Sequence, residues 1–425
     1  MSDERDIDYA ALTRENERAV LASEEAARAR VDALPMKITF EFTGDCNLHC
    51  FFCDCEFGRN VMRREGVHRF AMDEEKFRWM AENAFPRATI VNPTVVGEPF
   101  TFPFFDVMLE YAERYDVKLE IVTNGMLLKG PRMERLLPLL DRLIMSFDGG
   151  TKEVFEHCRT GSKFEVGSEN LRAFRDPRRK LGLERQAKFS FGVTLMRENI
   201  EDLVKIVEWG HELGADEVNA GHLLVFTKEL RGSSLFGHKA LSNRMIAAAQ
   251  ARARELGVRM TAPAPFDLDG EDEVGEAPET PAEITGLVPS AAHLGGDQHP
   301  RPSDSTYLAA EAPAPSWAEG RFWCKFAWRE VFINYFGDVA PCCHQGRPVV
   351  GNVFTDPWDE IWNGVEYQLL RSSLYERKPR PYCASCSLLA EQGLVDYDEK
   401  GYIFEDRYPD QDRADTSRPG RRARD

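Results

Sequence analysis

The sequence lacks the features of an exported or membrane-spanning protein. No apolar run approaches the length of about 20 residues that spans a bilayer. The N-terminal segment MSDERDIDY has neither the basic nor the apolar region of a signal peptide. We therefore expect a cytoplasmic protein that has no membrane partner and lies in a compartment where thiols stay reduced.

An excess of positive charge is also missing. The 425 residues include 71 acidic and 54 basic side chains, which give a net charge of −17. Such a surface repels polyanions, so nucleic acid is not expected as a partner. A neutral or cationic small-molecule substrate suits this charge better. Apolar residues make up 43% of the chain, which is enough for a sizeable core.

Strand and helix patterns alternate along the first half of the chain. This alternation predicts βαβ units and a parallel sheet, either open or curled into a barrel. In both forms, ligands bind at the carboxyl ends of the strands. The expected strands are 36–42, 88–93, 117–123, 142–147, 188–196 and 216–224. The expected helices are 73–85, 104–115, 132–140, 167–174, 200–214 and 240–257.

The segments outside this repeat define the other domains. Residues 8–33 are rich in Ala, Glu and Arg, which predicts one surface helix. Residues 262–319 contain too few large apolar groups to offset the entropy of ordering, so we expect a flexible insertion or, alternatively, a substrate lid. The predicted divisions are an N-terminal helix (1–35), the α/β repeat (36–261), the insertion (262–319), a cysteine-bearing domain (320–392) and a charged tail (393–425).

A first group of cysteines follows the first expected strand. The segment GDCNLHCFFC places Cys46, Cys50 and Cys53 in a CX3CX2C pattern. Three thiolates on one loop can bind three irons of a [4Fe–4S] cluster and leave the fourth iron open. From spacing alone, the alternative is a zinc site that Cys55 or His49 completes.

This pattern resembles the signature of the radical S-adenosylmethionine (SAM) superfamily, in which an aromatic residue such as Phe52 commonly precedes the third cysteine. The resemblance implies a partial (β/α)6 barrel over residues 36–261. It implies that the open iron chelates SAM, and that an electron from the reduced cluster cleaves SAM to a 5′-deoxyadenosyl radical. This radical removes a hydrogen atom from the substrate. An external one-electron reductant, a flavodoxin or ferredoxin, is then a required partner.

Short motifs at the later strand ends agree with this resemblance. VGEP is similar to the GGEP motif that receives the SAM amino group, with Val96 in place of the first glycine. TNG is common in the family, the S-x-D element of SFDG implies contacts to ribose hydroxyls, and the arginine of FEHCRTG implies a partner for the SAM carboxylate. The residues that the resemblance assigns to SAM are Gly97, Glu98, Pro99, Asn124, Ser146, Asp148 and Arg159.

A second group of cysteines lies in the C-terminal region and comprises Cys324, Cys342, Cys383 and Cys386. Spacing alone leaves zinc and iron–sulfur open. The segment REVFINYFGDVAPCC between them predicts a hairpin that turns at 336–338. The region resembles the SPASM/twitch extension of radical SAM enzymes. This implies a small α+β twitch domain in which the four cysteines hold one auxiliary [4Fe–4S] cluster, with Cys343 as the alternative to Cys342.

The remaining thiols and the reaction stay open at this stage. Cys55, Cys158 and Cys343 are either inert thiols or hydrogen-atom donors. Resemblance to aminocyclitol dehydrogenases of antibiotic pathways implies oxidation of an alcohol carbon in a sugar, aminoglycoside or aminocyclitol, with the auxiliary cluster as electron acceptor. Epimerisation of such a substrate is an alternative. Maturation of a ribosomally made peptide is another, although we expect a longer segment before Cys46 in such enzymes. A zinc-binding scaffold without catalytic activity is the fourth possibility.

Overall fold

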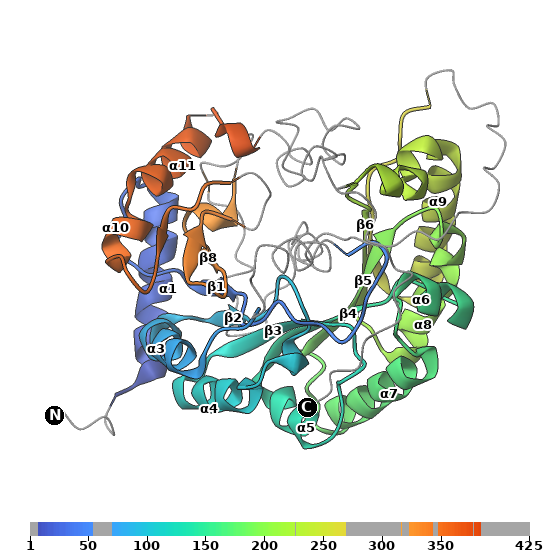
Figure 1. The fold of residues 1–425 in the computed structure, drawn as a ribbon, viewed down its shortest axis with the longest axis horizontal. Helices are drawn as coiled ribbons and strands as arrows, with labels where there is room; N and C mark the ends of the chain where they lie inside the picture. The colour runs from blue at the N-terminus through green and yellow to red at the C-terminus, as the bar shows by residue number, and fades with distance from the viewer. Residues whose placement is uncertain are drawn as a thin grey trace, which may run out of the picture.

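A computed structural model describes residues 7–53, 70–225, 227–268, 316, 323–342, 347–376 and 378–383. In this part of the chain, the strands form one sheet in the order β10-β9-β8-β1-β2-β3-β4-β5-β6-β7. Pairing is parallel from β8 through β1 to β7, and antiparallel in the β8–β9–β10 edge. The sheet curves, and helices cover its outer face (Figure 1). The expected α/β fold with a mostly parallel sheet is confirmed.

The elements have the following bounds. The strands are β1 (Lys37–Phe40), β2 (Ile90–Asn92), β3 (Lys118–Thr123), β4 (Leu140–Ser146), β5 (Lys188–Leu195), β6 (Glu217–His222), β7 (Arg259–Thr261), β8 (Glu330–Ile333), β9 (Asp338–Ala340) and β10 (Gly351–Asn352). The helices are α1 (Tyr9–Glu25), α3 (Glu74–Ala84), α4 (Phe105–Tyr115), α5 (Pro131–Leu136), α6 (Lys152–Cys158), α7 (Phe164–Lys180), α8 (Leu203–Leu213), α9 (Lys239–Leu256), α10 (Trp358–Trp362) and α11 (Val365–Tyr375).

Each strand and helix expected between residues 36 and 257 has a counterpart in the structure. The short elements α6 and β7 were not anticipated, because one or two turns of helix and three strand residues carry too little periodicity. The hairpin expected in the C-terminal region is present as β8 and β9. Most of the predicted insertion 262–319, and the tail 393–425, lie outside the described residues.

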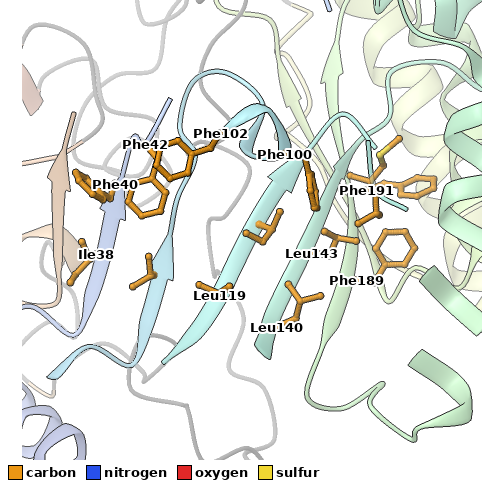
Figure 2. Packing of buried hydrophobic residues seen from close by; sticks show 14 of the residues in the cluster. Ile38, Phe40, Phe42, Phe100, Phe102, Leu119, Leu140, Leu143, Phe189 and Phe191 are labelled. Atoms are coloured by element: carbon orange, nitrogen blue, oxygen red, sulfur yellow. The ribbon is translucent and has the colours of Figure 1, made fainter. Parts of the chain in front are cut away.

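Two layers of side chains flank the sheet. The apolar layer lies between the strands and the outer helices, and Figure 2 shows part of it, including Phe40, Phe42 and Leu143. Phe42 packs edge-on against Phe77 of α3, with ring centroids 5.0 Å apart. Because side chains alternate along a strand, the residues between these apolar positions face the concave side of the sheet. That side is largely polar. Among the described residues, no helix has the length and apolar character that crossing a membrane requires.

The N-terminal segment packs against the C-terminal region. The expected surface helix over 8–33 is wrong in length, since α1 ends at Glu25 and Ala27 adopts a positive φ of 49°. Past the helix, the backbone N–H of Val31 donates to Asn363 Oδ1 at 2.9 Å, and Asn363 Nδ2 returns a bond of 2.8 Å. The Asn363 side chain therefore forms hydrogen bonds with backbone groups of Val31 that would bond within the helix if it were longer.

A buried ion pair joins the same two segments. The guanidinium of Arg329 lies 2.6 Å from the carboxylate of Glu24, and both side chains are nearly inaccessible to solvent. Glu24 also accepts a hydrogen bond of 2.8 Å from Trp323 Nε1. Since α1 is otherwise an amphipathic surface helix, this pair makes it part of the C-terminal region's core.

We predict that Glu24→Ala lowers the free energy of unfolding by about 3–5 kcal/mol, because it leaves the Arg329 guanidinium buried without its carboxylate. Thermal and urea unfolding would measure the loss. Arg14→Ala, which removes an exposed pair with Asp8 on the same helix, is the control and should change stability by less than about 1 kcal/mol. Equal effects of the two substitutions would contradict the structural role assigned to the buried pair.

Candidate active site

The first three cysteines lie on one loop that follows β1. Cys50 is buried, whereas Cys46 and Cys53 are partly exposed. Two N–H groups point at Cys46 Sγ, the backbone N–H of Leu48 at 3.4 Å and the side-chain amide of Asn124 at 3.7 Å. Donors of this kind stabilise a thiolate, which is the form that binds metal. Burial raises the pKa of the Cys50 thiol, Arg159 opposes the rise, and Cys53 and Cys46 add to it.

A cluster and a single metal ion require different arrangements of these thiols. Among the described residues, no three His, Cys, Asp or Glu side chains converge closely enough to hold one metal ion. A four-iron cluster needs a wider ligand set, with each thiolate on a different iron. Cys55, one of the two residues that could complete a zinc site, lies outside the described residues. His49 is exposed, and its backbone N–H donates to Thr160 O at 2.9 Å.

The turn after β2 packs directly on the cysteine loop. Gly97 has a φ of +80°, and a Cβ built there would lie 2.6 Å from Thr43 O and 2.7 Å from Asp45 O. The backbone N–H of Glu98 donates to Asp45 O at 2.7 Å. Pro99 begins a buried single turn of 3-10 helix after Glu98. Only glycine allows the backbone to come this close to the cysteine loop, which explains the second glycine of the GGEP-like motif at Gly97. This explanation does not depend on the first position of the motif, where Val96 replaces glycine.

The Glu98 carboxylate joins the strand ends of β2 and β3. Its oxygens accept hydrogen bonds of 2.7 Å from Thr123 Oγ1 and 2.8 Å from the backbone N–H of Asn124. Burial raises the pKa of Glu98 to about 7, although these two hydrogen bonds oppose the rise. The Asn124 amide in turn donates to Asn47 Oδ1 at 2.9 Å, within the cysteine loop. A buried carboxylate of this kind can bind an ammonium group.

The end of β4 contributes a buried ion pair. Ser146 is the last residue of the strand, and Asp148 follows it in a fully buried position. The Asp148 carboxylate lies 2.6 Å from Arg159 Nη2 and accepts a bond of 2.7 Å from the backbone N–H of Thr194. The arginine and aspartate that the sequence assigns to different parts of SAM therefore contact each other.

Of the three unassigned thiols, the structure describes only Cys158. It is fully buried at the end of α6. A hydrogen-atom donor must reach the substrate, so this placement favours an inert buried thiol. Cys55 and Cys343 lie outside the described residues, and their roles stay predictions.

Three of the four C-terminal cysteines belong to the described residues, and each is partly exposed. Cys324 precedes β8, Cys342 follows β9, and Cys383 ends a short 3-10 turn. Burial is the main cause that raises the pKa of Tyr367, and the thiols of Cys342 and Cys324 add to it, which places both near this phenol. Tyr382 lies near Cys383 and Cys342 in the same way. Cys386 is outside the described residues.

The concave side of the sheet carries a charged network that sequence reasoning missed. Lys37 Nζ on β1 lies 2.9 Å from Glu120 Oε1 on β3 and 3.3 Å from Glu330 Oε1 on β8. Lys325 contacts the same Glu330 oxygen at 3.1 Å. Although burial raises it, the pKa of Glu120 is lowered to about 2 by Lys37 and Arg142. Apart from Lys325, which lies in a short 3-10 turn, these residues occur in strands in which half or more of the residues are apolar, so only the alternation of side chains could have indicated a polar face.

Comparisons with known proteins agree with this arrangement. Residues 40–210 match the radical SAM superfamily, and residues 324–387 match SPASM, an iron–sulfur cluster-binding domain. The AdoMet-dependent heme synthase of Methanosarcina barkeri is 30% identical over 189 residues, which cover 43% of this chain and 48% of that protein. The chain thus spans about half of that relative. The PqqA peptide cyclase of Gluconobacter oxydans is 25% identical over 371 residues, 83% of this chain and 82% of the cyclase.

A solved structure shows the same fold. SuiB of Streptococcus suis, bound to its precursor peptide SuiA, superposes with a TM-score of 0.52 at 16% sequence identity. The superposition covers 96% of this chain and 82% of SuiB. Identity at this level supports the fold and leaves the substrate open.

We predict that Gly97→Ala reduces iron binding sharply, because the added methyl group must displace the carbonyl groups of the cysteine loop. Iron and sulfide per chain, measured after anaerobic reconstitution, would report the loss. Gly182→Ala is the matched control, since Gly182 has a similar φ of +66° but no atom within 4 Å of the new Cβ. If both variants bound as much iron as the natural protein, the loop would not depend on this contact.

Proposed function

Because residues 40–210 of this chain belong to the radical SAM superfamily and residues 324–387 to the SPASM cluster-binding domain, we propose that it removes a hydrogen atom from a polar substrate and oxidises the carbon. The two cluster domains on one chain are the observation that carries this proposal. The enzyme uses SAM and [4Fe–4S] clusters. When bound, the reduced cluster on the first cysteine loop supplies the electron that cleaves SAM.

Different residues are proposed to hold the catalytic cluster and to bind SAM. We assign Cys46, Cys50 and Cys53 to the catalytic cluster, with N–H donors from Leu48 and Asn124 at Cys46 Sγ supporting the assignment. Glu98 binds the amino group of SAM, since its carboxylate is buried at the end of β3 and its backbone N–H donates to Asp45 O of the cysteine loop. Its hydrogen bonds from Thr123 and Asn124 keep it oriented.

The C-terminal cysteines are proposed to hold one auxiliary cluster that accepts an electron. Oxidation of an alcohol carbon to a ketone removes two hydrogen atoms in total. The first leaves as a hydrogen atom to the SAM-derived radical. The second leaves as a proton and an electron, and the electron must pass to an acceptor. Cys324, Cys342, Cys383 and Cys386 are the proposed ligands of that acceptor, and an external flavodoxin or ferredoxin supplies the initial electron.

A small polar molecule, such as an amino sugar or aminocyclitol, is the first candidate substrate. The concave face of the sheet supports this choice, because charged and amide side chains line it between β8 and β6. Lys37, Glu120 and Glu330 are buried there in mutual ion pairs. A polar substrate that hydrogen-bonds to such groups recovers part of its desolvation cost, whereas an apolar substrate would offer these groups no hydrogen bond.

A peptide is the second candidate substrate, and one observation favours it. The PqqA peptide cyclase matches this chain over 83% of its length, whereas the heme synthase matches over 43%. A maturase would form a new bond on a peptide side chain or oxidise it, with the same cysteine loops in the same roles.

Product masses separate these reactions. The reconstituted protein would be incubated with SAM and reductant in D2O, with either a panel of amino sugars or peptides encoded beside its gene. An oxidase yields a product about two mass units lighter than the substrate, and an epimerase one that gains deuterium at carbon. Turnover of peptides alone would replace the small-molecule proposal with the maturase. Protein that holds zinc and no sulfide would refute radical SAM chemistry altogether.

We predict about eight irons per chain in the natural protein and about four in Cys383→Ala/Cys386→Ala. SAM cleavage should persist in this variant because the first cluster remains. Oxidised product should fall sharply while 5′-deoxyadenosine accumulates, because the substrate radical lacks its electron acceptor. Cys46→Ala is the opposite control and should abolish SAM cleavage. A normal yield of oxidised product from the double variant would exclude the auxiliary cluster as acceptor and favour epimerisation.

SAM binding should depend on the ionisation of Glu98. The pKa of Glu98 is raised to about 7, so its charged fraction rises about fivefold between pH 6 and pH 7. SAM affinity should rise by a similar factor over this range, because the ionised carboxylate accepts hydrogen bonds from the ligand's amino group more strongly than the protonated acid does. Equilibrium dialysis would measure it.

Two variants check the source of this pH dependence. Glu98→Gln should bind SAM weakly and without the rise between pH 6 and pH 7. Glu82→Gln, at a carboxylate that accepts a bond from Tyr111 on the helix side, should keep the rise. A natural protein whose affinity is flat over this range would rule out an ionising carboxylate at the ammonium site.

A further inference from the structure

Asp148 has a different environment from the one its S-x-D motif implies. The side chain is fully buried, and one oxygen accepts the backbone N–H of Thr194 at 2.7 Å. The other oxygen lies 2.6 Å from Arg159 Nη2. The backbone carbonyl of Asp148 is also occupied, by Asn199 Nδ2 at 3.1 Å. One carboxylate oxygen is thus hydrogen-bonded, and the other is in an ion pair with Arg159 but has no hydrogen bond within the described parts of the chain.

Arg159 lies between this carboxylate and the cysteine loop. Its guanidinium lies 5.9 Å from the ring centroid of Phe52, which sits next to Cys53. Among the charged groups around Cys50, Arg159 acts on the thiol most strongly. The chain directly after Arg159 bonds the loop, because His49 N–H donates to Thr160 O at 2.9 Å. The guanidinium is therefore held at the loop from two sides.

One donor of this guanidinium is left over. Arg159 Nε is buried, and no acceptor for it occurs within the described parts of the chain. A buried N–H donor without an acceptor is costly, by an amount comparable to a lost hydrogen bond. An anionic group bound beside the cysteine loop would satisfy it, and a carboxylate matches the geometry of guanidinium donors.

We propose that Asp148 is a positioning residue that holds Arg159 for the carboxylate of SAM, and that it does not bind the ribose. Asp148 fixes one edge of the guanidinium through Nη2, which leaves Nε to the ligand. The backbone N–H of Thr194 fixes the aspartate in turn. This inference rests on the proposed SAM site and adds the residue that determines how SAM's carboxylate is recognised.

The test compares two ligands that differ only in the carboxylate. SAM and decarboxylated SAM share the ribose, the adenine and the sulfonium. Their dissociation constants would be measured by equilibrium dialysis with reconstituted protein, whose iron content confirms an intact cluster. The natural protein should prefer SAM by about tenfold or more, as expected for a charge-assisted hydrogen bond. In Asp148→Asn that preference should fall by about tenfold, the share that the Arg159 contact contributes, because SAM loses affinity and decarboxylated SAM does not.

Variants separate positioning from other roles. Arg159→Lys should lose the same preference, since a point charge does not replace the planar fork, and Asp148→Asn/Arg159→Lys should be no weaker than Arg159→Lys alone. Asp202→Asn is the fold control. Asp202 is another buried carboxylate that accepts bonds from Gly150 and Thr151, so its variant should lose stability and keep the ligand preference.

Each outcome has a distinct meaning. An equal loss of affinity for SAM and for decarboxylated SAM in Asp148→Asn would show that Asp148 contacts the ribose, and would overturn the proposal. An unchanged preference would make the ion pair purely structural, and would overturn it too. A natural protein that binds iron but neither ligand would instead remove the SAM site, and with it the proposed function.

Discussion

The close approach of the β2 turn to the cysteine loop is the contact on which the site depends. Two carbonyl oxygens of the loop, from Thr43 and Asp45, point at the position that a Cβ would take at Gly97. Because that position holds no side chain, the N–H of Glu98 reaches Asp45 O, and its carboxylate reaches the end of β3. The parallel register makes this possible, since β1, β2 and β3 end at the same edge of the sheet. The absence of a side chain at Gly97 thus allows the ends of β1, β2 and β3 to contact one another.

Buried charged groups are compensated differently on the concave face of the sheet and at the cysteine loop. Along the concave face, Lys37, Glu120 and Glu330 are buried as mutual partners, so their charges are compensated before any ligand binds. At the cysteine loop, the Glu98 carboxylate has hydrogen-bond donors but no adjacent cation at ion-pair distance among the described residues, and Arg159 keeps one donor unsatisfied. Uncompensated groups beside compensated ones are typical of binding sites, because ligand binding then releases part of the desolvation cost.

Sequence reasoning predicted the repeat and the placement of the motifs at strand ends, because both depend on local periodicity and on the common edge of parallel strands. It failed where a residue's partner is distant along the chain. Asp148 satisfies the S-x-D pattern, yet its partner is decided by the turn that carries Arg159 and by the N–H of Thr194. Likewise, the N-terminal helix ends early because Asn363 and Arg329 take groups from its end and from the chain after it. No pattern within 8–33 contains that information.

The pairing of β8 with β1 connects the two groups of cysteines. β1 leads into the first cysteine loop, and β8 follows Cys324 and precedes the hairpin that ends at Cys342. Lys37 and Glu330 are direct partners in this ladder and also form an ion pair. Glu24, Arg329 and Asn363 join the N-terminal segment to the same region. The ladder from β8 to β1 therefore fixes the position of the C-terminal cysteines relative to the first cysteine loop, on which the proposed transfer of an electron between the two sites depends.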